Sequence, residues 1–158
     1  MVNRRLPSLG PRGEGWFIGQ LVFIVAIALA PSDVWAEPLA APARWTGIIL
    51  LAAGLALAGR GALDLGASLT PFPRPRRTGE LVERGVYGVL RHPIYGGLML
   101  LAGGWSLTRP SGAGLLLSLA FALFLDLKAR REEQFLEATF PGYEAYRRRT
   151  RRFIPRVY

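Results

Sequence analysis

The sequence predicts an all-α protein, an integral membrane helical bundle of about four transmembrane helices that ends in a C-terminal cytoplasmic helix and tail. Hydrophobic residues make up 51% of the 158 residues, and the mean hydropathy of +0.24 is higher than soluble domains usually show. Four apolar runs carry no internal charge, at residues 16–30, 45–59, 94–108 and 112–125. Arginines gather at alternate ends of these runs, as basic residues do on the cytoplasmic side of a membrane.

The first apolar run follows Arg4, Arg5 and Arg12. Like the other runs it is shorter than the roughly 20 residues of a usual span, so we expect each to extend into its flanks or to lie in a thinned bilayer. A secretory signal is the alternative, since Val-Trp-Ala at 34–36 resembles a cleavage site. Charged residues interrupt the lead-in, and removal of this run would place the basic termini on opposite sides of the membrane.

The second run extends through Arg60 and Asp64, which lie four residues apart and therefore on one helical face. This spacing indicates an ion pair near the membrane surface, of structural or other use. The segment that follows, Pro-Phe-Pro-Arg-Pro-Arg-Arg at 71–77, is typical of a stiff extended linker. Residues 78–90 are too polar to span a bilayer, and we expect them to fold back over the membrane face.

The third and fourth runs are joined by Arg-Pro-Ser-Gly at 109–112, a turn that allows only an antiparallel helical hairpin. Glycines at 96, 97, 103 and 104 would let another helix or a ligand approach the backbone. We therefore expect one domain, residues 1–158, with an N-terminal helix pair (1–70), a connector (71–92), a helical hairpin (93–127) and a cytoplasmic helix and tail (128–158).

Charge sets the expected topology. The segments that precede the second run and join the last two carry only Arg44 and Arg109, whereas the other connections and both ends are rich in arginine. We expect a multi-pass protein of the cell inner membrane with both termini cytoplasmic. The same bias explains the net charge of +9, and the basic residues beside the membrane would also attract anionic lipid headgroups, so no nucleic-acid partner is expected. With no cysteine and one histidine, we expect no metal site and no thiol nucleophile.

Two polar clusters flank the hairpin. In the first, His92 precedes Pro93, which suits the first turn of a helix, so the ring and free amide hydrogens would face the cytoplasmic mouth of the bundle and hold an anionic group. Alternatively His92 is a simple cap, and Tyr87 and Tyr95 are interfacial anchors. The second cluster contains Lys128, Arg130, Arg131, Glu132 and Glu133. Neighbouring side chains on a helix point about 100° apart, so one carboxylate can face inward, unless the cluster is only a solvated stop signal.

The combined order of these motifs resembles the isoprenylcysteine carboxyl methyltransferase family and its phospholipid N-methyltransferase relatives over roughly residues 71–155. It comprises Gly-Val-Tyr at 85–87, Arg-His-Pro-Ile-Tyr-Gly-Gly at 91–97, the hairpin, Glu-Glu at 132–133, two tyrosines and a basic tail. The resemblance implies an enzyme that takes S-adenosylmethionine from the cytosol. Its methyl acceptor would be a lipophilic or small molecule, with a carboxylate, amine or thiol, reached from the bilayer.

Carried over residue by residue, the resemblance implies a cofactor pocket lined by Leu81, Val82, Tyr87, His92, Pro93, Ile94, Tyr95 and Gly97, with Glu132 and Glu133 as further cofactor contacts. It implies acceptor binding by Lys128, where the eukaryotic carboxyl methyltransferases have an arginine, and by Arg131. It assigns no general base. The alternative is a non-catalytic membrane protein of the same fold, acting as a lipid-binding or assembly subunit. A transporter is disfavoured because the runs contain no ionisable residue.

Overall fold

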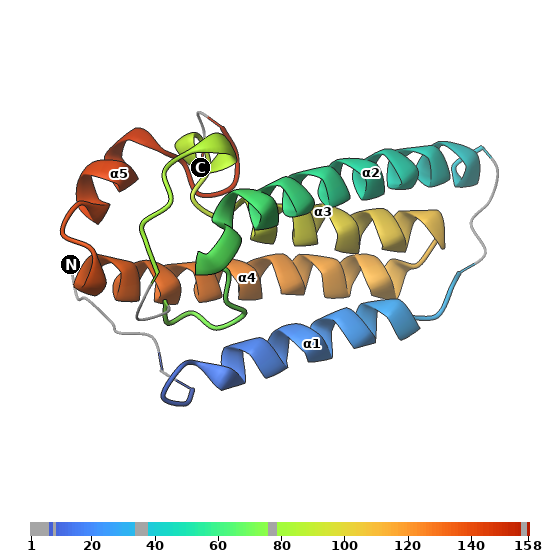
Figure 1. The fold of residues 1–158 in the computed structure, drawn as a ribbon. Coiled ribbons are helices and arrows are strands. Elements are labelled where there is room, and N and C mark those ends of the chain that lie inside the picture. Colours follow the sequence, from blue (N-terminus) through green and yellow to red (C-terminus); the bar gives the residue numbers. More distant parts are fainter. Residues whose placement is uncertain (1–6, 8, 34–37, 76–78, 156–157) are drawn as a thin grey trace.

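The computed structural model of the chain describes residues 7, 9–33, 38–75, 79–155 and 158 (Figure 1). Its elements in chain order are α1 (Glu14–Leu29), α2 (Ala40–Leu65), η1 (Gly66–Ser68), η2 (Gly85–Gly88), α3 (Pro93–Thr108), α4 (Gly112–Thr139) and α5 (Tyr143–Arg149), the two η elements being 3-10 turns. No strand occurs among these residues, so the all-α prediction is confirmed. The 34–36 cleavage motif, Thr78 and five of the predicted cytoplasmic arginines (Arg4, Arg5, Arg76, Arg77 and Arg156) lie outside the described residues.

Two helical stretches are long and apolar enough to cross a bilayer, Ala40–Ser68 and Gly112–Thr139. The other two predicted spans, α1 and α3, have 16 residues each and are about 24 Å long. Many large apolar side chains on the long helices point outward, among them Leu55, Leu63, Leu116 and Leu119. An outer surface of this composition indicates association with a membrane, because a soluble helix would bury these side chains.

Helices α2 and α3 pack backbone to backbone through glycines spaced seven residues apart. A Cβ atom added at Gly47 would lie 2.7 Å from the carbonyl oxygen of Gly104, and one added at Gly54 would lie 2.7 Å from that of Gly97. Any larger side chain would push the helices apart, so these glycines set the distance between α2 and α3. Gly103, by contrast, has open space where a Cβ would lie.

The helices lie side by side, with α3 and α4 between α2 and α1 (Figure 1). The core includes Ile27 of α1, Ala102 of α3, and Phe121 and Leu125 of α4. The start of α1, η2, α5 and the C-terminal segment gather at one end of the bundle. Helix α4 continues unbroken to Thr139, so the expected boundary at residue 128 falls inside a helix.

The predicted pair of Arg60 and Asp64 forms, with 2.8 Å between Nη2 and Oδ1. Asp64 also accepts a hydrogen bond of 2.9 Å from the backbone N–H of Val86. The neighbouring Gly85 has a φ of +61°, and a Cβ there would clash with the Asp64 carboxylate. The pair therefore has a structural role, because it ties η2 to the end of α2.

We expect Gly54→Ala to destabilise the bundle by about 1–3 kcal/mol, because the methyl group would overpack the contact with Gly97. The matched change Gly103→Ala, in the open, should be neutral or stabilising, since alanine has the higher helix propensity. Thermal unfolding in detergent, followed by circular dichroism, measures both. Equal effects of the two substitutions would contradict the close α2–α3 packing.

Candidate functional site

A cavity of about 390 Å³ lies where the connector meets α3 and α4. Its volume is within the range of roughly 300–1,000 Å³ that small-molecule sites usually have. Apolar side chains form much of the wall, and a smaller number of charged and phenolic groups face the interior. The lining residues are Gln20, Leu65, Ser68, Leu69, Thr70, Pro71, Pro75, Gly79, Glu80, Leu81, Val82, Tyr87, Arg91, His92, Ile94, Tyr95, Leu98, Lys128, Glu132, Leu136, Phe140, Tyr143 and Tyr146.

The structure brings most of the predicted site residues together at this cavity. Those that line it are Leu81, Val82, Tyr87, His92, Ile94, Tyr95, Lys128 and Glu132. Pro93 and Gly97 are buried behind the wall: Pro93 begins α3 and packs on Gly61, and Gly97 packs on α2. Glu133 and Arg131 also lie outside the lining.

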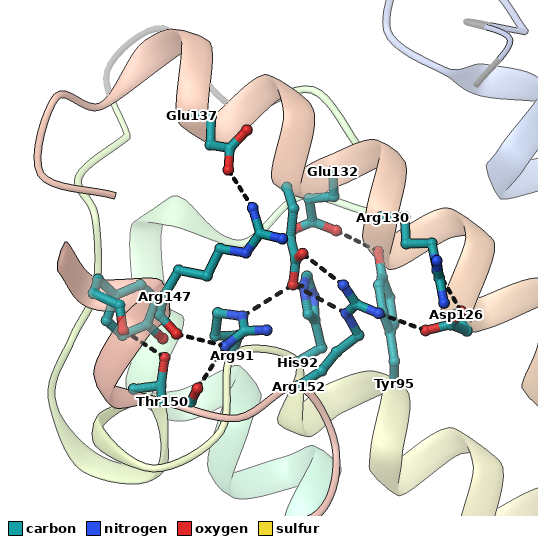
Figure 2. Close-up of polar contacts among 12 residues, drawn as sticks. Arg91, His92, Tyr95, Asp126, Arg130, Glu132, Glu137, Arg147, Thr150 and Arg152 are labelled. Atoms are coloured by element: carbon teal, nitrogen blue, oxygen red, sulfur yellow. Dashed lines mark hydrogen bonds and ion pairs between the residues drawn. The ribbon is translucent and has the colours of Figure 1, made fainter. Parts of the chain in front are cut away.

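The two adjacent glutamates have different surroundings. Glu132 lines the cavity, and its Oε2 accepts a hydrogen bond of 2.7 Å from the Tyr95 hydroxyl (Figure 2). Glu133 is 3% exposed and accepts hydrogen bonds from Arg91 Nε at 3.0 Å and Arg152 Nη2 at 2.8 Å. Adjacent side chains of a helix point about 100° apart around its axis. Glu132 therefore faces the cavity and is available to a ligand, whereas Glu133 is part of the scaffold.

The ring of His92 lies between Tyr95, which lines the cavity, and the scaffold residue Glu133. It is stacked on Tyr95 with an interplanar angle of 3°, and its Nε2 lies 3.3 Å from Oε1 of Glu133. The backbone N–H of His92 donates to the carbonyl of Arg152 at 3.1 Å. The residue is thus held at the entrance of α3 from both its ring and its backbone.

The C-terminal segment, residues 150–158, packs against the scaffold carboxylates and contributes no described residue to the lining. Its Arg152 is 8% exposed and bridges Glu133 and Asp126, and the Tyr158 hydroxyl also bonds to Asp126. Burial disfavours the charged guanidinium, but the hydrogen bonds and charge of Glu133 outweigh it and raise the pKa of Arg152. Sequence reasoning treated Arg152 only as one of the basic residues that set topology, since nothing in a run of arginines marks the one that turns inward.

Three buried phenols, those of Tyr87, Tyr143 and Tyr146, also line the cavity. Burial raises the pKa of Tyr87, Tyr143 and Tyr146, so each phenol stays neutral and can donate a hydrogen bond. The Tyr146 hydroxyl donates to the carbonyl of Tyr87 at 2.8 Å. The Tyr143 hydroxyl is buried and has no partner among the described residues, although buried polar groups nearly always have one. A ligand group in the cavity would satisfy it.

Lys128 is 1% exposed and lines the cavity. Its Nζ donates to Gln20 Oε1 at 2.5 Å and to the carbonyl of Pro71 at 3.1 Å, and lies 5.1 Å from the ring centroid of Tyr95. The predicted second acceptor residue, Arg131, instead stacks on Phe135 of its own helix. Sequence reasoning missed Gln20, since one amide in an apolar run has no distinctive pattern.

Within the described residues, no three histidine, cysteine, aspartate or glutamate side chains gather in a way that could hold a metal ion. The charged groups that line the cavity are the carboxylates of Glu80 and Glu132, the guanidinium of Arg91 and the buried ammonium of Lys128, and several phenols lie beside them. Such a set binds a polar organic molecule with apolar parts.

The profile of the phospholipid methyltransferase family matches residues 42–142. The chain therefore belongs to the phospholipid methyltransferase family, which confirms the resemblance that the motifs indicated. It is 32% identical over 146 residues to the cobalt-zinc-cadmium resistance protein CzcN of Cupriavidus metallidurans, an alignment that covers 87% of this chain and 61% of that protein. It is 36% identical over 83 residues to the nickel-cobalt-cadmium resistance protein NccN of Alcaligenes xylosoxydans xylosoxydans, covering 52% and 39%. The chain thus matches about three fifths and two fifths of the lengths of these relatives.

We expect Glu133→Gln to lower the free energy of unfolding by about 3–5 kcal/mol, because it removes the charge that compensates two buried guanidinium groups. Glu137→Gln is the matched control, since Glu137 forms only an exposed pair with Arg147 and should matter by less than about 1 kcal/mol. Chemical unfolding in detergent measures both. If the two variants were equally stable, the buried cluster would not organise the site.

Proposed function

We propose that the chain is an S-adenosylmethionine-dependent methyltransferase that transfers a methyl group to a lipophilic or small acceptor reached from the bilayer. The observation that carries the proposal is the pairing of Glu132 with Tyr95 in a cavity that the buried ammonium of Lys128 also lines. Family membership supports it, because the family is one of membrane methyltransferases.

The residues present fit this cofactor. A nucleoside needs apolar surface for its base and hydrogen-bonding groups for its sugar, and the cavity offers Leu81, Val82 and Ile94 beside Tyr87, Tyr95 and Glu132. The unpartnered hydroxyl of Tyr143 offers one further hydrogen bond. His92, Pro93, Gly97 and Glu133 would hold the entrance of α3 in place behind these contacts.

S-adenosylmethionine, when bound, supplies a methyl group on a positively charged sulfur. Glu132 provides the negative charge that attracts such a cation, and the Tyr95 hydroxyl holds the carboxylate in one orientation. The apolar walls exclude water, and Lys128 attracts and orients the acceptor. Alignment of two reactants in this way can supply roughly 7–11 kcal/mol of catalysis. A carboxylate acceptor would need no general base.

The same proposal places the chain in the cell inner membrane as a four-span protein with both termini cytoplasmic. The two shorter helices, α1 and α3, lie beside the two long ones, and the start of α1 and the C-terminal segment lie at one end of the bundle (Figure 1). The arginine distribution favours the cytoplasm for that end.

A second candidate function is suggested by the names of the two relatives, which refer to metal resistance. In that case the chain is a non-catalytic membrane component of such a system, and lipid or another protein occupies the cavity. Binding of the cofactor product distinguishes the two candidates.

We expect purified protein in detergent to bind S-adenosylhomocysteine, as measured by isothermal titration calorimetry. Glu132→Gln and Tyr95→Phe should each weaken binding by about tenfold, since each removes a hydrogen bond to a charged group worth about 1.5–3 kcal/mol. Glu137→Gln, outside the cavity, should bind like the wild type. Absence of binding by the wild type favours the non-catalytic function, and unchanged binding by both cavity variants excludes the assigned site.

Transfer should also be visible in membranes. With S-adenosylmethionine labelled in its methyl group, we expect label in the lipid or small-molecule fraction of membranes that contain the wild type, and none with Glu132→Gln. Equal labelling with both proteins would contradict the proposed role of Glu132.

A further inference from the structure

We infer that Gln20 of α1 is a specificity-determining residue, which together with Lys128 forms a subsite for an anionic oxygen group of a lipophilic acceptor. The inference rests on the proposed function and names the chemical class of its second substrate. Helix α1 lies outside residues 42–142, so this contact comes from a part of the chain that the family profile does not match.

The geometry places Gln20 at the one buried lysine of the chain. The carboxamide Oε1 accepts from Lys128 Nζ at 2.5 Å, and both side chains line the cavity. Helix α1 is held against α4 by aromatic contacts on either side of this position, Trp16 with Phe124 and Phe23 with Phe121. The stretch of α1 that carries the Gln20 amide is therefore packed against α4.

The charge of Lys128 has no carboxylate hydrogen-bonded to it among the described residues. Its two acceptors are an amide and a backbone carbonyl, both neutral. The carboxylate one helical turn further on, Glu132, is bonded to the Tyr95 hydroxyl instead. Burial of an ammonium whose hydrogen-bond partners are all neutral is unfavourable, and an anionic ligand would reduce that cost.

The groups that this subsite offers are donors. While Oε1 of Gln20 is bonded to Lys128, its amide nitrogen makes no hydrogen bond to the described residues, so it keeps two hydrogens for a ligand. An ammonium and an amide N–H₂ match an oxyanion, and they repel an amine headgroup. The acceptor or its anchoring group is therefore a carboxylate or a phosphate on a lipophilic body.

The subsite is tested with purified protein in phosphatidylcholine vesicles and four lipids that carry a photoreactive diazirine in the acyl chain: a fatty acid, its methyl ester, a fatty amine and a phosphatidic acid. Cross-linking to the α1 and α4 peptides is quantified by mass spectrometry against lipid concentration. We expect half-saturation by the fatty acid or the phosphatidic acid at a concentration about tenfold lower than by the methyl ester, as a charge-assisted hydrogen bond would give.

Gln20→Leu should weaken this preference, because the anionic group loses the amide donor while Lys128 keeps its charge, and should leave binding of S-adenosylhomocysteine unchanged. Gln20→Glu should abolish the preference, because its carboxylate would neutralise Lys128. Gln134→Leu is the matched control: Gln134 is on α4, bonds to Arg131 and does not line the cavity. A preference for the fatty acid alone identifies a carboxylate, and a shared preference identifies any anionic oxygen.

Three results would overturn the inference: no preference in the wild type, a preference unchanged in Gln20→Leu, or loss of S-adenosylhomocysteine binding in that variant, which would make Gln20 a support of the cavity. If the wild type prefers anionic lipid and binds no S-adenosylhomocysteine, the subsite stands and the methyltransferase proposal fails.

Discussion

The carboxylate of Glu133 is the contact on which the arrangement of the site depends. It lies on α4, and its partners come from the entrance of α3 and from the C-terminal segment (Figure 2). A carboxylate that is 3% exposed must be compensated, and two guanidinium groups and an imidazole do so together. Because these partners come from two different segments, the position of Glu133 determines where α3 starts and where the tail runs.

The part of the cavity wall that Tyr87 forms depends on contacts made by α2. Helix α2 packs on α3 through Gly47 and Gly54, and at its end Asp64 binds the backbone of η2. The η2 turn presents Tyr87 to the cavity. The close packing of α2 on α3 and the bond between Asp64 and η2 together position the turn that carries Tyr87, so glycines of α2 take part in the construction of the cavity.

Groups of both charges line the cavity. Glu132 is hydrogen-bonded to Tyr95, and Lys128 is hydrogen-bonded to Gln20. A molecule that carries positive charge and one that carries negative charge could lie there together, each next to a group of opposite charge. This pattern agrees with a two-substrate reaction, and the metal-resistance names of the relatives neither require nor explain it.

The sequence by itself determined the all-helical class, the hairpin and the family, because apolar runs, turn residues and the Arg-His-Pro motif are local signals. The resemblance that the motifs carry also implied one site for Tyr87, His92, Tyr95, Lys128 and Glu132, and all five line the cavity. Only the tertiary structure decided that Glu133 and Arg152 form scaffold, that Gly97 packs on a helix, that Arg131 stays outside the lining, and that Gln20 meets Lys128. These contacts join segments 19 to 108 residues apart in the chain, and no local pattern specifies which segments will meet.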